Sequence, residues 1–306
     1  MIPEHPEEPA KIAHQASATD ISFTNLAPQP PLYPAEAEDY ARAALALSAA
    51  AVQRCERIAD LQYGDTAAHK LDVYPSRKPA GQTSPVLVFA HGGAWTNGYK
   101  EWVALMAPAL VAAGITFVSI SYRLAPAFKW QALLDDCHAA LSWVVRNIHE
   151  YGADPARIAV GGHSAGGHLM TLAALSAQGL HRHGILASSI LACFPLCAPL
   201  DIRYPERAPG SGEERTHQNL LDDVSDAESA SPVCRVNQDT PPMLLAYARE
   251  DLPRIIKGNQ TMEAELRKLG RPVETMVLPG DHFAPAIAAG QADSPWMKRL
   301  IQIMQG

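Results

Sequence analysis

Cysteine is scarce in this sequence: the chain has 5 cysteines in 306 residues, and no two of them form a Cys-x-x-Cys pair. An odd and sparse set of this kind offers no disulfide framework. The opening residues carry acidic side chains and prolines, where a secretory signal needs a basic start and an apolar core. Both absences predict a protein of a reducing compartment, the cytoplasm.

Positive charge is also limited. The chain has 25 Lys and Arg residues against 32 Asp and Glu residues, which gives a net charge of −7, and it contains no block rich in Lys or Arg. Nucleic acids and anionic membranes attract basic surfaces. We therefore expect neither of them as a partner.

Long apolar runs are nearly absent. Residues 102–122 contain no charged side chain and are about long enough to span a bilayer. Pro108 and Gly114, however, divide this run into a helical piece and a β-rich piece. A buried helix followed by a buried strand explains the run better than a membrane span does.

The usual motifs for bound cofactors are missing as well. The sequence contains no G-x-x-x-x-G-K-[ST] phosphate loop and no G-x-G-x-x-G dinucleotide turn. His181 and His183 form a close histidine pair, but nothing near them in the sequence completes a set of four metal ligands. We expect no cofactor and no metal ion.

What the chain does have is the composition of a packed globular protein, with 47% hydrophobic and 19% charged residues. Short apolar segments alternate with helical ones, and fully apolar strands are typical of a parallel sheet that is covered on both faces. The sequence therefore predicts an α/β protein with a mostly parallel central sheet and helices on both faces. The predicted strands span 57–63, 70–74, 85–90, 115–120, 157–160, 185–193, 243–248 and 273–278, and the predicted helices include 35–55, 100–113, 130–149 and 259–269.

Two segments depart from this alternation. Residues 1–34 are rich in Pro, Glu, Ala and Gln and show no sustained period, which predicts an arm that is draped on the surface or partly disordered. We assign 35–306 to a single domain. Within it, we interpret 35–56 and a charged, Pro- and Gly-containing insertion at 201–238 as a small cap over the active-site end of the sheet. We expect the insertion to be structureless.

A nucleophile motif stands at Gly162-His-Ser-Ala-Gly166, which fits G-x-S-x-G. A predicted strand precedes it and a predicted helix follows it, which is the setting that a nucleophile elbow requires. Small residues on both sides of Ser164 let the strand and the helix approach each other. Ser164 is the predicted nucleophile.

The order of catalytic residues in this architecture is Ser, then acid, then His. Among the histidines after Ser164, His282 alone follows an apolar strand and a turn, where α/β sheets place their sites. Its acid partner should lie on the loop after the preceding strand, and that loop offers two adjacent carboxylates, Glu250 and Asp251. The local sequence does not separate these two.

A second glycine-containing loop, His91-Gly-Gly-Ala-Trp95, directly follows another apolar strand. Backbone N–H groups in such a loop can face a developing oxyanion. We expect the donors to be Gly93 and Ala94, together with Ala165 after the nucleophile. The candidates for the substrate pocket are Gly92, Trp95 and His163.

Four motifs in this order resemble the α/β-hydrolase superfamily over about residues 60–300. They are His91-Gly-Gly-Ala-Trp, Ser121-Tyr-Arg-Leu-Ala-Pro, Gly162-His-Ser-Ala-Gly-Gly-His-Leu and Asp281-His-Phe. Carboxylesterases of the hormone-sensitive-lipase and feruloyl-esterase-like type are the most similar branch, with kynurenine formamidases nearby. The resemblance implies that Ser164 is the nucleophile, His282 the base and Asp251 the acid. The chain departs from the family pattern at Ala248, where the family has glycine, and Asp281-His-Phe leans toward the formamidases.

The resulting prediction is a cofactor-free serine hydrolase that cleaves a small-to-medium carboxylic ester through an acyl-enzyme. One alternative is an arylformamidase acting on an N-formylkynurenine-type amide. Another is a non-catalytic ligand-binding protein on the same fold, since fold does not imply function. The expected partner is a small-molecule ester or amide, and the sequence leaves open whether the chain forms a homodimer.

Overall fold

The computed structural model describes residue 23 and residues 26–79 and 81–306. Most of the arm that we expected at 1–34 lies outside these residues. The described part is built around one eight-stranded sheet in the order β1-β2-β4-β3-β5-β6-β7-β8. The strands are β1 (Ile58–Gln62), β2 (Lys70–Tyr74), β3 (Ser84–Ala90), β4 (Thr116–Ile120), β5 (Ala153–His163), β6 (Ile190–Leu196), β7 (Met243–Glu250) and β8 (Val273–Asp281).

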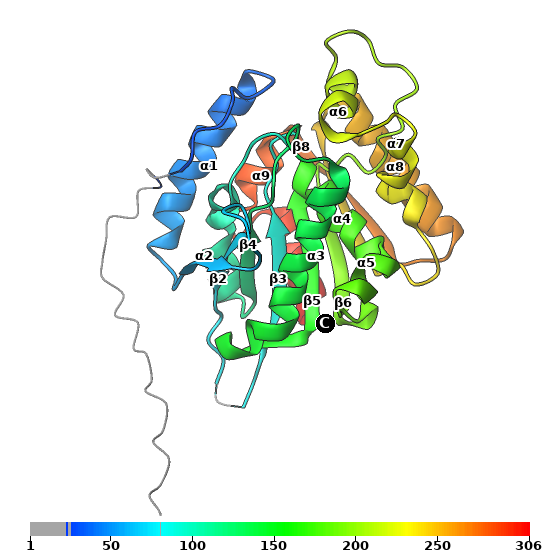
Figure 1. Ribbon diagram of the computed structural model, residues 1–306. Coiled ribbons are helices and arrows are strands. Elements are labelled where there is room, and N and C mark those ends of the chain that lie inside the picture. The colour runs from blue at the N-terminus through cyan, green and yellow to red at the C-terminus, as the bar shows by residue number, and fades with distance from the viewer. Residues whose placement is uncertain (1–22, 24–25, 80) are drawn as a thin grey trace, which may run out of the picture.

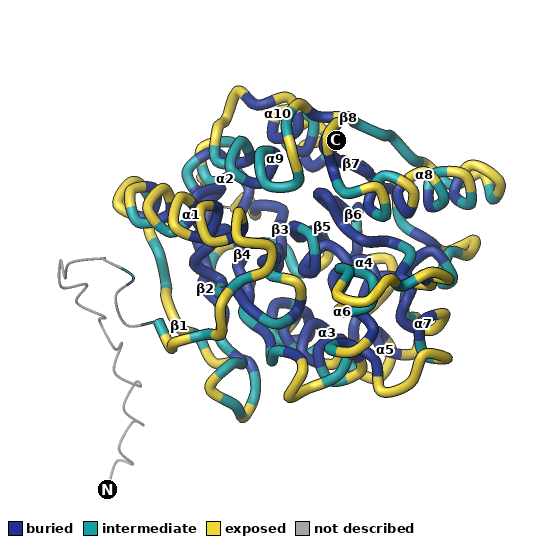
Figure 2. Tube along the Cα trace, turned by 90° about the horizontal axis from the view of Figure 1, so that it is seen from above, coloured by how far each residue is buried: buried dark blue, intermediate teal, exposed yellow. Residues whose placement is uncertain are grey.

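Strands β3 to β8 run parallel to one another, and β2 pairs in antiparallel fashion with β1 on one side and β4 on the other. The prediction of a mostly parallel sheet is confirmed. Figure 1 shows the helices around the sheet, and Figure 2 shows the central strands buried, with exposed residues on the outer helices and loops. The helices and 3-10 turns are α1 (Glu36–Val52), η1 (Lys100–Met106), α2 (Ala107–Ala112), α3 (Trp130–Asn147), η2 (Ile148–Tyr151), α4 (Ala165–Leu175), α5 (Ala177–Arg182), η3 (Ala187–Ser189), α6 (Gly212–Leu220), α7 (Asp226–Ser229), η4 (Pro232–Arg235), α8 (Pro253–Lys268), α9 (Ala284–Ala288) and α10 (Pro295–Gln305).

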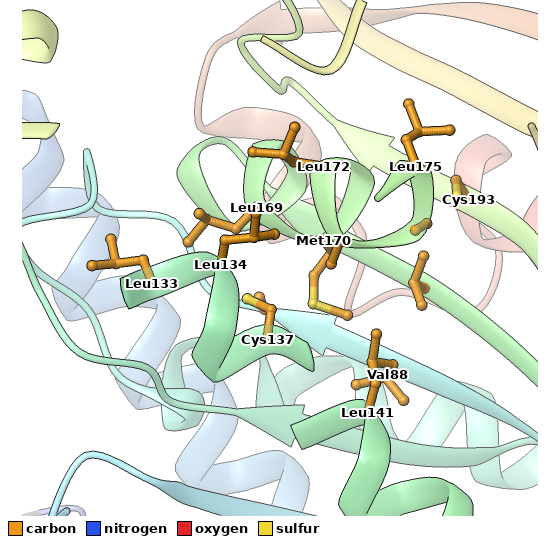
Figure 3. Packing of buried hydrophobic residues seen from close by; sticks show 14 of the residues in the cluster. Val88, Leu133, Leu134, Cys137, Leu141, Leu169, Met170, Leu172, Leu175 and Cys193 are labelled. Carbon is orange, nitrogen blue, oxygen red and sulfur yellow. The ribbon is translucent and has the colours of Figure 1, made fainter. Parts of the chain in front are cut away.

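The alternation of side chains along β3 explains why helices cover both faces. Val86 and Val88 belong to a core shared with α3, α4 and α8, whereas Leu87 and Phe89 belong to a core shared with α1, α2 and α10. Successive side chains of a strand point to opposite faces, so a fully apolar strand needs cover on both. In Figure 3, side chains of α3 and α4 such as Leu141 and Met170 pack near Val88 of β3.

Several element boundaries differ from the prediction. The helix expected at 100–113 is divided into the 3-10 segment η1 and the helix α2, which has Pro108 in its first turn. The strand expected at 185–193 begins only at Ile190, because η3 occupies the three residues before it. Helix α8 begins at Pro253, six residues earlier than predicted, with proline in its first turn, where the missing N–H costs no hydrogen bond.

The insertion at 201–238 is not structureless, so that prediction was wrong. It contains α6, α7 and η4. The side chain of Ser211 accepts a hydrogen bond from the N–H of Glu214 at 3.1 Å, and Glu214 in turn accepts one from Gly210. This Ser-x-x-Glu capping pattern begins α6. The helix was not predicted because the segment has few apolar residues and therefore no apolar period.

The apolar run at 102–122 is part of the globular core. It passes through η1, α2 and β4, with the chain turning at Gly114 between the last two. In the part of the chain that the structure describes, no helix combines the length and the apolar character that crossing a bilayer needs.

Four buried histidines predict how stability depends on pH. Burial lowers the pKa of His91, His138 and His168 to about 4 and that of His163 to about 3, from the ordinary 6.5. The unfolded chain binds protons near pH 6.5 and the folded chain does not, so these groups contribute their full stability above pH 6.5. Between pH 6.5 and 4 the free energy of unfolding should fall by about 1.4 kcal/mol per pH unit for each histidine that stays neutral.

Urea unfolding at pH 7.5, 6 and 5 measures this slope. Replacing the buried His138 by glutamine should reduce this slope by about 1.4 kcal/mol per pH unit, because one proton fewer is taken up on unfolding. An unfolding free energy that stays constant from pH 7.5 to 5 contradicts the prediction.

Candidate active site

Ser164 occupies a sharp turn between β5 and α4. Its backbone has φ 50° and ψ −118°, which is unfavourable for a residue with a side chain. Strain of this kind costs about 1–3 kcal/mol and persists only where the surrounding packing imposes it. The turn raises Ser164 above the carboxyl end of β5, where its hydroxyl borders a cavity.

Two glycines make this turn sterically feasible. A Cβ atom on Gly162 would lie 2.3 Å from the backbone carbon of Gly166. A Cβ atom on Gly166 would lie 2.3 Å from the carbonyl oxygen of Ala90 in β3. The G-x-S-x-G spacing therefore follows from the close approach of β3, β5 and α4 beneath the serine.

Three side chains distant in the sequence form one chain of hydrogen bonds. Nε2 of His282 lies 2.9 Å from Oγ of Ser164, and Nδ1 of His282 lies 2.7 Å from Oδ1 of Asp251. His282 follows β8 and Asp251 follows β7, so the ends of neighbouring parallel strands bring them together. The imidazole thus stands between a hydroxyl and a carboxylate, which is the arrangement of an activated serine.

Asp251 is held as a carboxylate. Its oxygens accept hydrogen bonds from the N–H groups of Ala248 at 3.2 Å and Leu252 at 2.8 Å. Burial raises the pKa of Asp251, but the hydrogen bonds and charge of His282, with smaller contributions from Cys197 and Ala248, outweigh it and lower the pKa overall. Glu250, the alternative that the sequence left open, is exposed to solvent.

His163 forms a hydrogen bond with the backbone of His282. Its Nε2 lies 3.1 Å from the carbonyl oxygen of His282, so this nitrogen carries the proton and donates it. Its Nδ1 has no hydrogen-bond partner among the described residues. Burial and the neighbouring His282 lower the pKa of His163 to about 3, which keeps the ring neutral at pH 7. The contacts indicate that this histidine fixes the position of His282.

The loop after β3 presents backbone N–H groups to the same cavity. Gly93 and Ala94 have φ of 114° and 51°, and within the described part of the chain their N–H groups have no acceptor. A Cβ atom on Gly93 would lie 2.1 Å from the carbonyl oxygen of Asn97, so this turn requires glycine. Ala165 is the first residue of α4, and the first N–H groups of a helix have no partner inside it.

Buried polar contacts hold this loop in place. Nε1 of Trp95 donates to Nδ1 of His168 at 3.2 Å, and Nε2 of His168 donates to the carbonyl oxygen of Ala230 at 2.7 Å. The hydroxyl of Tyr122 donates to the carbonyl oxygen of His91 at 2.8 Å. His168 and Tyr122 therefore brace the loop and do not face the serine.

The cavity above Ser164 has a volume of about 440 Å³. Trp95 and His163, two of the three predicted pocket residues, line it, but Gly92 does not. Gly92 instead packs beneath the site, since a Cβ atom there would lie 2.7 Å from Nδ1 of His163 and 3.3 Å from Cβ of Ser164. The prediction that Gly92 lines the pocket was wrong, because glycine is required there for close packing against His163 and Ser164.

Most of the other residues that line the cavity were not predicted from the sequence. One wall comes from residues 30–34 and from α1, and another comes from the insertion and from the start of α8. Figure 1 shows α1 and α6 on opposite sides above the sheet. Tyr40 of α1 stacks on Phe283, with ring centroids 5.1 Å apart, and Phe283 directly follows His282. The Asp281-His-Phe motif was the one sequence signal for this contact.

The described residues include one group that could hold a metal ion, formed by His163, Cys197 and His282. Their ligand atoms lie within 4.8 Å of one another. His282 already binds Ser164 and Asp251 through its two ring nitrogens, so a metal ion here would displace one of these bonds. The donor set therefore does not fit a resident metal cofactor.

A family model for BD-FAE matches residues 71–266, which include the loop after β3, Ser164 and Asp251. The chain belongs to the BD-FAE family. This match confirms the predicted esterase-branch resemblance, whereas the suggested link to kynurenine formamidases stays a prediction.

Curated relatives of this BD-FAE chain include esterases. It is 32% identical to esterase LipC of Mycobacterium tuberculosis over 231 residues, which cover 71% of this chain and 57% of LipC. It is 28% identical to the isoprenylcysteine alpha-carbonyl methylesterase ICME of Arabidopsis thaliana, over 71% of this chain and 54% of that protein. The matches thus span only a little over half the length of these relatives.

Solved structures resemble the BD-FAE chain over most of its length. The Pyrobaculum calidifontis esterase aligns with a TM-score of 0.69 and 22% identity, over 88% of this chain and 92% of the other. A carbohydrate esterase from gut microbiota aligns with a TM-score of 0.69 and 19% identity, over 82% of this chain and 95% of the other. These neighbours and the strand order confirm the α/β-hydrolase fold.

Proposed function

We propose that this chain is a serine hydrolase that cleaves small-to-medium carboxylic esters through an acyl-enzyme. The observation that carries the proposal is the hydrogen-bonded chain from Ser164 through His282 to Asp251 at the edge of a cavity. The names of the relatives support an ester as the substrate. No metal or cofactor is needed for this chemistry.

The first half-reaction uses each of the three side chains. Oγ of Ser164 attacks the ester carbonyl carbon while Nε2 of His282 takes the hydroxyl proton. Asp251 accepts the Nδ1–H bond and stabilises the imidazolium without taking the proton itself. His282 then returns the proton to the leaving alkoxide, and the alcohol departs, leaving the acyl group on Ser164.

Backbone donors stabilise the charge that develops in this step. The negative oxygen of the tetrahedral intermediate would accept hydrogen bonds from the N–H groups of Gly93, Ala94 and Ala165. In the second half-reaction water attacks the acyl-enzyme, His282 takes a proton from that water, and the carboxylic acid is released while the Ser164 hydroxyl re-forms. The same donors serve both intermediates.

We further propose that residues 35–56 and 201–238 act as a cap that controls access to the serine. Residues of α1 and α6 line the cavity on different sides, and Lys129 ties the end of α6 to the domain through the carbonyl oxygens of Gln218 and Asn219. We also propose that the protein resides in a reducing compartment, the cytoplasm. Its five cysteines are all free, which supports this proposal.

The test compares two substrates, p-nitrophenyl acetate and N-formylkynurenine, each with Ser164→Ala protein as the control. We expect ester turnover that depends on Ser164 and exceeds formamide turnover. Formamide turnover far above ester turnover would instead identify an arylformamidase. Failure of Ser164 to react with a fluorophosphonate, measured by intact mass, together with no turnover of either substrate, would identify a non-catalytic binding protein.

A further inference from the structure

The charged side chains that line the cavity are all of one sign. Among the described residues, Arg215 of α6 and Arg254 of α8 line it, and no Asp, Glu or Lys does. The chain as a whole carries a net charge of −7. Two cations on one wall of the cavity therefore run against the average charge of the protein, and they create a local field that favours an anion.

Arg215 keeps most of its hydrogen-bonding capacity. Its guanidinium lies 4.0 Å from the centre of the Tyr33 ring, and its Nε donates a long hydrogen bond of 3.4 Å to the carbonyl oxygen of Gly210. In the described part of the chain it forms no ion pair, and no acceptor faces its two terminal nitrogens. Stacking on Tyr33 fixes the plane of the guanidinium and leaves its outer N–H groups available.

Arg254 is only weakly paired. Its Nη1 lies 3.5 Å from Oε1 of Glu213, at the limit of a hydrogen bond, and the side chain of Arg254 is 24% exposed. The guanidinium packs against the backbone of Gly212, where a Cβ atom would lie 2.7 Å from Nη2. Glycine at 212 thus makes room for Arg254 beside the first turn of α6.

The position of Arg254 in its own helix is unfavourable. It is the second residue of α8, where the helix dipole disfavours a cation. It also follows Asp251 by three residues, so the helix that carries this cation begins directly after the loop that carries the proposed catalytic acid. A cation at this end does not stabilise α8, which points to a role in the cavity.

Tyr204 adds a neutral donor to the same wall. It lines the cavity, and its hydroxyl has no hydrogen-bond partner among the described residues. Burial raises the pKa of Tyr204, the neighbouring charges of Glu213 and Asp201 raise it further, and Arg254 does not offset this, so the hydroxyl stays protonated. This wall thus holds two guanidinium groups and one hydroxyl with no carboxylate of the protein lining it.

We propose that Arg215 and Arg254 select esters that carry a free carboxylate at a distance from the scissile bond. A guanidinium binds a carboxylate through two parallel hydrogen bonds, and such charge-assisted bonds are stronger than neutral ones. The inference rests on the proposed esterase function and names its substrate class. The carboxylate can lie on the acyl side or on the alcohol side, which two pairs of substrates distinguish.

Each pair differs only in carboxylate against carboxamide. On the alcohol side the pair is 4-acetoxybenzoate and 4-acetoxybenzamide, and on the acyl side it is monoethyl adipate and ethyl adipamate. In at least one pair we expect kcat/KM of the carboxylate member to exceed that of the amide by about tenfold or more. The preference should shrink as salt is raised, because screening weakens the attraction to an exposed cation.

Variants assign the preference to the two arginines. Arg215→Gln and Arg254→Gln should each lower the carboxylate-to-carboxamide ratio of kcat/KM by about threefold or more, toward a value of one, mainly through KM. Arg254→Lys should restore part of the ratio. Arg267→Gln is the matched control, since Arg267 lies on α8 but is exposed and pairs with Glu263, so the ratio should not change. A ratio is insensitive to the fraction of folded protein.

Equal kcat/KM for both members of both pairs would overturn the inference, as would a ratio that the arginine variants leave unchanged. Calorimetric binding to Ser164→Ala protein separates this failure from that of the proposed function. Tighter binding of 4-acetoxybenzoate than of 4-acetoxybenzamide, with no turnover of any ester tested (p-nitrophenyl acetate included) and no fluorophosphonate adduct on the wild-type protein, would refute the esterase proposal and support the anion site. Equal binding of the two compounds and of the adipate pair would refute the anion site.

Discussion

Replacing Ser164 by alanine should lower the turnover of p-nitrophenyl acetate by on the order of a millionfold. The hydroxyl is the group that forms the covalent bond to the substrate in the proposed mechanism, and it lies 2.9 Å from Nε2 of His282. Alanine removes the attacking atom and leaves the cavity, the backbone donors and the histidine in place. Residual catalysis should therefore remain about 10³–10⁴-fold above the reaction in water.

Steady-state turnover and the initial burst of p-nitrophenol measure the effect together. The wild-type protein should release a burst of one equivalent when deacylation is the slower step, whereas Ser164→Ala should release none. Intact mass after treatment with a fluorophosphonate should show one adduct on the wild-type protein and none on the variant. A purified variant that keeps more than a hundredth of the wild-type turnover would show that Ser164 is not the nucleophile.

The core of the site was predictable because its constraints are local. Gly162 and Gly166 are required by atoms of neighbouring strands and helices, so the spacing around Ser164 appears directly in the sequence. His282 and Asp251 follow adjacent strands whose order is set by the fold. Chain order, together with the place of His282 after an apolar strand and a turn, therefore identified the histidine. The local sequence left the choice between Asp251 and Glu250 open, and only the family resemblance favoured Asp251, because the choice depends on which side chain the end of β7 turns inward.

The walls of the cavity were not predictable in the same way. Tyr40, Arg215 and Arg254 lie on three helices that tertiary structure brings to one cavity, and no spacing in the sequence relates them. The sequence pattern did not predict helix α6 because its nine residues are mostly polar, so its start depends on the cap at Ser211 and not on an apolar period.

Gly92 illustrates a different kind of miss. A glycine in a loop next to a nucleophile suggests contact with substrate, yet its hydrogen faces the ring of His163 and the Cβ of Ser164. The sequence shows that a small residue is present but not whether substrate or protein atoms require it. The structure shows that protein atoms, those of His163 and Ser164, require it.

Replacing Asp251 by asparagine should lower kcat by about 10⁴-fold, whereas replacing the adjacent Glu250 by glutamine should leave kcat within about twofold of the wild-type value. The carboxylate of Asp251 lies 2.7 Å from Nδ1 of His282 and accepts a hydrogen bond from the N–H group at this nitrogen. An amide at this position can donate an N–H to Nδ1, which would place the imidazole proton on Nε2. In that tautomer Nε2 can no longer take the proton of Ser164.

The pair is a matched control, because both changes remove one negative charge from consecutive residues at the end of β7. A loss that depended only on charge near the site would appear in both variants, whereas a loss that depends on the hydrogen bond to Nδ1 appears in Asp251→Asn alone. The proton position can be measured directly, since ¹⁵N chemical shifts of the imidazole ring distinguish the two tautomers of His282. If Glu250→Gln were the damaging change and Asp251→Asn nearly harmless, the acid would be Glu250, and the end of β7 would have to turn the other way during catalysis.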